Sequence, residues 1–131
     1  AHVAGNYQAL GTGIIHSAQY PEGTQAIAEA LQSLHQYPSL TCDIEGFSLR
    51  FNEAGIGTIA FAWDQHNGIA FACDYQPFPE PIDGLHGGYV NNVEVKRLLK
   101  KFFTKYKGKL IWHNSVYDTK VLIYELWMRN L

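Results

Sequence analysis

Two carboxylates stand two positions apart at the end of an apolar segment, Leu40-Thr41-Cys42-Asp43-Ile44-Glu45. Side chains alternate between the two faces of a strand, so Asp43 and Glu45 are expected to project from the same face. Two like charges held this close repel one another unless a cation lies between them. Hard ions such as Mg²⁺ and Mn²⁺ prefer oxygen ligands. The pair is therefore a candidate metal site, although the same spacing also occurs where a strand runs out into solvent.

The pattern of apolar and turn-forming residues predicts the elements that would position this pair. Helices are expected over residues 24–37 and 93–106 and from residue 118 onward, strands over 40–45, 56–63, 68–73 and 109–113, and loops over 46–55 and 74–92. The Asn67-Gly68 dipeptide predicts a tight turn between the second and third strands, which would then form an antiparallel hairpin.

This order of elements predicts an α/β fold with a mixed sheet flanked by helices. The hairpin would pair with strand 40–45 on one side, and helix 93–106 would deliver strand 109–113 parallel to it on the other side. Sites in such sheets form at the carboxyl ends of parallel strands. One of these strands ends at the carboxylate pair and the other leads to Asn114 and Asp118. We therefore expect a third carboxylate, Asp118, to join the pair.

The composition is that of a globular protein, with 47% hydrophobic and 17% charged residues in a chain of 131. This length favours one domain with a single core. No apolar run approaches the roughly 20 residues of a membrane span, and residues 1–20 lack the pattern of a signal peptide. Cys42 and Cys73 lie in apolar runs and are expected to be buried, reduced thiols. These features predict a cytoplasmic protein with no membrane partner.

Charge is distributed unevenly along the chain. Residues 1–95 carry a formal charge of −9, and residues 96–131 carry +7. Much of the positive charge lies on helix 93–106, on the side opposite its apolar stripe, at Lys96, Arg97, Lys100, Lys101 and Lys105. This basic side is expected to be a solvated face, a contact with phosphate or a contact with a neighbouring domain.

The segments that carry the carboxylates resemble known motifs. Asp43-Ile44-Glu45-Gly46-Phe47-Ser48-Leu49 is similar to the first motif of the DnaQ-like (DEDD) 3′→5′ exonucleases. Asn114-Ser115-Val116-Tyr117-Asp118 is similar to their second motif, in the form found in proofreading domains of family A (polymerase I-like) DNA polymerases. The resemblance covers residues 24–131, leaves residues 1–23 as an N-terminal extension, and implies a ribonuclease H-like sheet.

The resemblance implies a two-metal hydrolysis at a DNA 3′ end, with Mg²⁺ or Mn²⁺ as the cofactor. Asp43 would bridge both ions, Glu45 would bind the ion that activates water, and Asp118 would hold the second ion. Asn114 would contact the terminal nucleotide. Leu49 would pack against the terminal bases, and Phe47 is a weaker candidate for the same surface. The implied partners are a single-stranded DNA 3′ end and the remainder of a polymerase chain.

The family also carries a third motif, Tyr-x-x-x-Asp or His-x-x-x-x-Asp, on a later helix. Its position would fall beyond Leu131, the last residue of this sequence. We therefore expect a partial exonuclease domain that lacks the fourth metal ligand and is incomplete at the C-terminal end of its sheet. Two alternatives stay open: an RNA exonuclease of the RNase D type, and a catalytically silent nucleic-acid-binding or scaffold module of the same fold.

Overall fold

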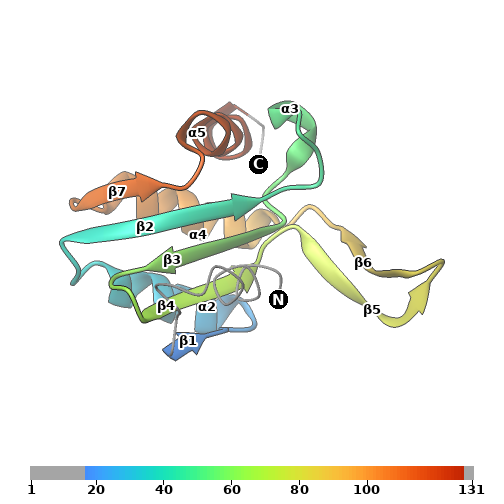
Figure 1. Cartoon of the computed structure of the whole chain (residues 1–131), viewed down its shortest axis with the longest axis horizontal. Helices are drawn as coiled ribbons and strands as arrows, with labels where there is room; N and C mark the ends of the chain where they lie inside the picture. The colour runs from blue at the N-terminus through green and yellow to red at the C-terminus, as the bar shows by residue number, and fades with distance from the viewer. Residues whose placement is uncertain (1–16, 129–131) are drawn as a thin grey trace.

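A five-stranded mixed sheet in the order β1-β4-β3-β2-β7 organises the computed structural model, which describes residues 17–128 (Figure 1). Its strands are β1 (Ser17–Gln19), β2 (Ser39–Glu45), β3 (Thr58–Ala62), β4 (Asn67–Ala72) and β7 (Lys109–Trp112). Strand β2 runs antiparallel to β3 and parallel to β7, and β1 runs parallel to β4. The predicted α/β class, the hairpin and the parallel crossover are thus confirmed.

Most of the predicted N-terminal extension, residues 1–16, lies outside the described residues. Strand β1 is the part of that segment that the structure does describe. It pairs with β4 from Ser17 opposite Asn67 to Gln19 opposite Ile69, and so adds an edge strand to the sheet.

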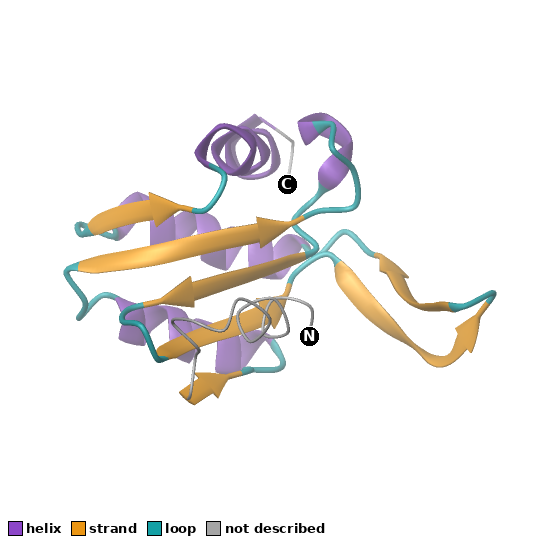
Figure 2. Cartoon of the chain, viewed as in Figure 1, coloured by secondary structure: helices purple, strands orange, loops and turns teal. Residues whose placement is uncertain are grey.

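Helices α2 (Thr24–Leu34) and α4 (Val93–Lys105) cover one face of the sheet (Figure 2). Alternate residues of β2 are buried beneath them. The core on this face is built from β2 (Leu40, Cys42, Ile44), β3 and β4 (Ile59, Phe61, Ile69, Phe71), α2 (Ile27, Leu31, Leu34) and α4 (Val95, Leu99, Phe102). Cys42 and Cys73 are free, buried thiols, as expected. No helix within residues 17–128 is long and apolar enough to cross a membrane.

The region after β7 differs in detail from the prediction. Helix α5 covers Ser115–Ile123 and continues as a π-helical turn, η1 (Tyr124–Met128). The helix therefore begins earlier than the predicted start at Asp118, which lies in its first turn. A short helix, α3 (Phe51–Ala54), also interrupts the expected loop 46–55.

The expected loop 74–92 is instead largely a hairpin, and that prediction was wrong. Strands β5 (Tyr75–Ile82) and β6 (Leu85–Tyr89) pair with each other in a separate two-stranded sheet that projects from the main sheet (Figure 1). We call this hairpin the β5–β6 arm. Asp83 and Gly84 join its strands with φ angles of 51° and 79°, as a type I′ turn requires.

The turn between β3 and β4 lies earlier in the chain than the sequence predicted. Asn67 and Gly68 already belong to β4, and the turn is made by the residues before them. The Asp64 carboxylate accepts hydrogen bonds from the backbone N–H groups of His66 and Asn67 at 2.7 and 2.9 Å. Hydrogen bonds from the Asn67 side chain and from these N–H groups lower the pKa of Asp64.

Candidate active site

A cleft of about 620 Å³ opens where β2 and β7 end. The six residues that the sequence singled out all line it, namely Asp43, Glu45, Phe47, Leu49, Asn114 and Asp118. Ile44, Gly46, Ser48, His113 and Tyr117 complete the lining. The two sequence segments that resemble exonuclease motifs therefore form the two sides of one depression.

Strand β2 positions the first two carboxylates. Its residues alternate between buried and partly exposed, and Leu40, Cys42 and Ile44 occupy the buried positions. Asp43 and Glu45 occupy partly exposed positions that alternate with these, so they share the face of β2 opposite the helices. The side-chain alternation predicted for this pair is confirmed.

The parallel neighbour β7 brings Asp118 to the same end of the sheet. The β2–β7 pairing ends with Cys42 opposite Trp112, and the His113 N–H then donates to the Cys42 carbonyl at 3.1 Å. Asn114 follows as the N-cap residue of α5. One turn later, Asp118 accepts a hydrogen bond from the Asn114 N–H at 3.2 Å through Oδ2, and only 1% of Asp118 is exposed.

The charges of Asp43 on β2 and Asp118 on α5 affect one another. Burial raises the pKa of Asp118 to about 6, the Asn114 N–H lowers it, and the negative charge of Asp43 adds to the increase. Burial also raises the pKa of the Cys42 thiol, and the charges of Asp118 and Asp43 contribute to that shift. Asp43 and Asp118 therefore repel one another, which is the condition that a bound cation relieves.

The donor set fits a hard divalent cation, because it consists of carboxylate oxygens in mutual repulsion. Asp43 and Asp118 interact directly through their charges, and Glu45 lies on the same strand face as Asp43. Within residues 17–128, however, no three His, Cys, Asp or Glu side chains are grouped closely enough to hold a metal ion. The described part of the chain thus presents two carboxylates that repel one another, Asp43 and Asp118, with Glu45 on the same face of β2 as Asp43.

Apolar side chains stand exposed at the rim of the cleft. Leu49 is 95% exposed, and Phe47 is 45% exposed. Phe47 makes an edge-on contact with Tyr89 at the base of the β5–β6 arm, with ring centroids 5.5 Å apart. Exposed apolar side chains of this kind can pack against a base without reading its identity.

A hydrogen bond across the cleft was not anticipated from the sequence. The Tyr117 hydroxyl on α5 donates to the Ser48 carbonyl at 2.6 Å, and so holds the loop of Phe47 and Leu49 to the helix of Asp118. Gly46 lies beneath this bond, because a Cβ there would come within 2.8 Å of the Tyr117 hydroxyl. The glycine inside the first motif was the available sequence signal.

The structure also contradicts the prediction that Lys96 lies on the side of α4 opposite its apolar stripe. Lys96 is fully buried, together with Asp74 and Glu125. Its Nζ lies 3.0 Å from Oδ2 of Asp74 and 2.7 Å from Oε1 of Glu125. Its position three residues before Leu99 places it at the margin of the apolar stripe, which was the signal that could have identified it.

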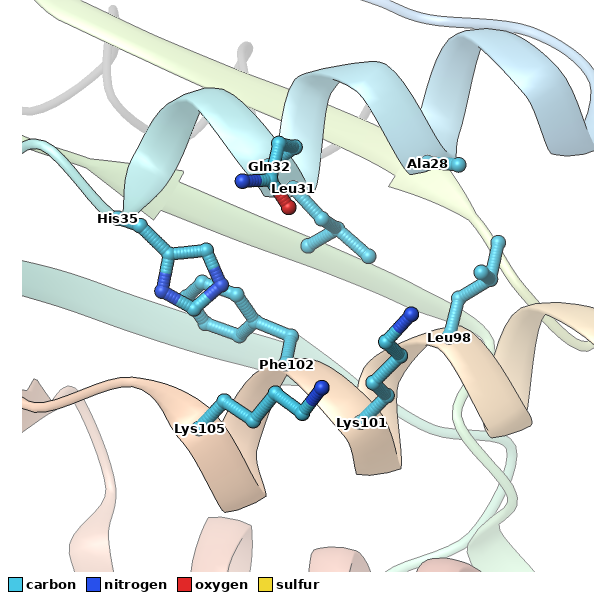
Figure 3. A pocket seen from close by; sticks show the side chains of 8 residues that line it. All are labelled: Ala28, Leu31, Gln32, His35, Leu98, Lys101, Phe102 and Lys105. Atoms are coloured by element: carbon cyan, nitrogen blue, oxygen red, sulfur yellow. The ribbon is translucent and has the colours of Figure 1, made fainter.

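A second depression, of about 480 Å³, lies between α2 and α4 (Figure 3). Apolar side chains form its floor, and the amines of Lys101 and Lys105 reach over it from α4 (Figure 3). Its lining contains no carboxylate and shares no residue with the cleft. Of these two depressions, the cleft is therefore the one that is lined by carboxylates.

Comparison with the sequence models of known protein families gives no match, and comparison with curated protein sequences gives none either.

Proposed function

We propose that this chain is a ribonuclease H-like 3′→5′ exonuclease domain of the DnaQ-like kind, which removes nucleotides from a single-stranded DNA 3′ end as a proofreading unit of a DNA polymerase. One observation carries the proposal: all six residues named from the motif resemblance line a single cleft at the ends of β2 and β7. The mutual repulsion of Asp43 and Asp118 supports a cation at this place.

Each side chain has a role in the proposed reaction. Asp43, Glu45 and Asp118 would hold Mg²⁺ or Mn²⁺, and the bound ions would supply hydroxide near neutral pH and offset charge on the phosphate. The exposed Leu49 and Phe47 would stack against the terminal bases. Asn114, with an amide that can donate and accept, would contact the terminal nucleotide.

Metal binding is the test suited to these residues, because the family's third motif does not occur after Asp118 in this sequence. In a Mn²⁺ titration followed by electron paramagnetic resonance, we expect a weak site with a dissociation constant of about 0.1–1 mM. Asp43→Ala should abolish it. Glu29→Ala removes an exposed carboxylate on α2 and is the matched control, which should bind like the wild type.

A catalytically silent module is the second candidate. The observation in its favour is that residues 17–128 contain no grouped set of three metal-binding side chains. This candidate gains if the wild type shows no Mn²⁺ binding up to about 10 mM, well above the range of weak protein sites.

Comparison of 5′-labelled DNA and RNA strands then addresses the substrate of an active form, and shortening from the 5′ end would contradict the proposed polarity.

A further inference from the structure

The three charged side chains Asp74, Lys96 and Glu125 form a cluster in the interior, which we call the buried ion cluster. Lys96 donates to Glu125 at 2.7 Å and to Asn91 Oδ1 at 2.8 Å, and its ammonium lies 3.0 Å from Asp74. Burial lowers the pKa of Lys96, but its hydrogen bonds to Glu125 and Asp74 outweigh burial and raise it overall. Lys96 is therefore held as a cation between two carboxylates from different parts of the chain.

Asp74 connects the cluster to one side of the cleft. Its Oδ2 accepts from the Ile56 N–H at 2.9 Å, and its own N–H donates to the Ile56 carbonyl at 2.7 Å. Ile56 belongs to the connection between β2 and β3, and the same connection is closed by the Phe47 N–H donating to Ala54 at 2.7 Å. Asp74 thus fixes Ile56 in the β2–β3 connection, and the same connection contains the loop of Phe47.

Asp74 also holds the base of the β5–β6 arm. Its Oδ1 accepts from the Asn92 N–H at 2.9 Å, and its carbonyl accepts from the Val90 N–H at 2.8 Å. The arm's last residue, Tyr89, contacts Phe47. Asp74 therefore holds the start of α4 and the β2–β3 connection through its carboxylate, and the base of the arm through its backbone carbonyl.

Glu125 connects the cluster to the other side of the cleft. It lies in η1, which continues directly from the helix that carries Asp118. Leu126 and Val121 are buried beside it in the core. The bond from Lys96 to Glu125 therefore ties the far end of the α5–η1 helix to the interior, while Tyr117 ties its near end to Ser48.

We propose that Lys96 is a positioning residue of the candidate active site, because it joins the β2–β3 connection, through Asp74, to the α5–η1 helix, through Glu125, and so sets the separation of the two sides of the cleft. The importance of this separation for catalysis rests on the proposed function, but the link itself does not. In this arrangement the reach of the Glu125 side chain matters more than its charge.

Two variants of Glu125 separate reach from charge. Glu125→Gln keeps the length and an oxygen that can accept from Lys96, but removes the charge. Glu125→Asp keeps the charge but shortens the side chain by about 1.5 Å, the length of one carbon–carbon bond. Both are conservative changes, and each serves as the control for the other.

Residue-resolved amide hydrogen exchange on the whole chain is the test. In Glu125→Asp, we expect protection of α5 to fall about tenfold while β2 and β3 keep theirs, as in a local opening. Glu125→Gln should keep α5 protected. The proposal is overturned if α5 is equally protected in both variants, if only Glu125→Gln loses protection, or if protection in Glu125→Asp falls evenly over α5 and the sheet.

Mn²⁺ affinity tests whether the buried ion cluster positions the carboxylates of the candidate active site. Residues that orient metal ligands typically change affinity by about 10- to 100-fold when altered, so the Glu125→Asp variant should bind Mn²⁺ at least about tenfold more weakly than Glu125→Gln. Equal affinities in the two variants would contradict the positioning role. If the wild type itself binds no Mn²⁺, the proposed function fails. The exchange measurement still decides whether Lys96 joins the two sides of the cleft.

Discussion

At the scale of single residues, Asp118 is placed where its charge is disfavoured. Burial raises its pKa from 3.8 to about 6, and the charge of Asp43 adds to the shift. The folded state therefore binds a proton at pH values where the unfolded state has already lost it. By linkage, the stabilisation from this protonation is complete below about pH 4 and is lost as the pH rises through about 6. Near neutral pH and without divalent ions, the ionised carboxylate destabilises the fold.

Asp118→Asn should accordingly raise the free energy of unfolding by about 3 kcal/mol at about pH 7.5 in EDTA, and change it little at about pH 4. The substituted amide would keep an oxygen for the Asn114 N–H, so this hydrogen bond is not lost. Urea unfolding followed by circular dichroism measures both values. A variant that is less stable than the wild type at about pH 7.5 would show that the charged form of Asp118 is not disfavoured.

At the scale of elements, the β5–β6 arm is an addition to the domain and not a part of its core. No residue within Tyr75–Tyr89 belongs to the hydrophobic core or to the partly buried residues packed against it. Its strands pair only with each other among the described residues. What fixes the arm is its base, where Asp74 bonds to Ile56 and Asn92.

Replacing residues 77–87 by Asn-Gly keeps the pairing of Gln76 with Gly88 and removes the rest of the arm. Because no core contact is lost, the free energy of unfolding should change by no more than about 0.5 kcal/mol. Asp74→Ala is the matched control at the base and should lose about 3–5 kcal/mol, because it removes one of the two carboxylates around the buried Lys96 and the acceptor of the Ile56 and Asn92 N–H groups. Denaturant unfolding of both proteins compares them. An arm deletion as damaging as Asp74→Ala would mean that the arm supports the core.

Elements that are specified by short-range sequence patterns were predicted correctly. The β3–β4 hairpin and helix α4 were predicted because local alternation and local periodicity specify them. The arm was missed because Pro77, Pro79 and Pro81 disfavour strands, whereas a two-stranded ribbon has outer edges where a missing N–H does no harm. Its Asp83-Gly84 turn was the overlooked signal.

Side-chain surroundings were predictable only where topology brought segments together. The carboxyl ends of adjacent parallel strands placed Asp43 and Asp118 correctly in one cleft. Lys96 was misplaced because helical periodicity predicts the direction of a side chain but not the residues that contact it. Its carboxylate partners come from the end of a hairpin and from the π-helical turn η1, and neither was visible in the pattern of α4.

At the scale of the whole molecule, the order β1-β4-β3-β2-β7 divides the sheet into a local centre and distant edges. Strands β2, β3 and β4 are consecutive and pair as a meander. The edge strand β7 reaches β2 only after the arm and α4 have intervened. Pairings between distant segments form slowly, because the chain must close a long loop before any contact offsets the lost entropy.

This strand order has a kinetic consequence for the cleft. In pulsed hydrogen-exchange labelling during refolding, amides of β2–β4 should become protected before those of β7 and α5. Simultaneous protection of all five segments would contradict this order. Asp43 is then in place early, and Asp118 arrives with the last pairing. A newly made chain would thus hold two of the three carboxylates of the proposed cation site until its sheet closes, and any activity of the cleft would begin only when folding is complete.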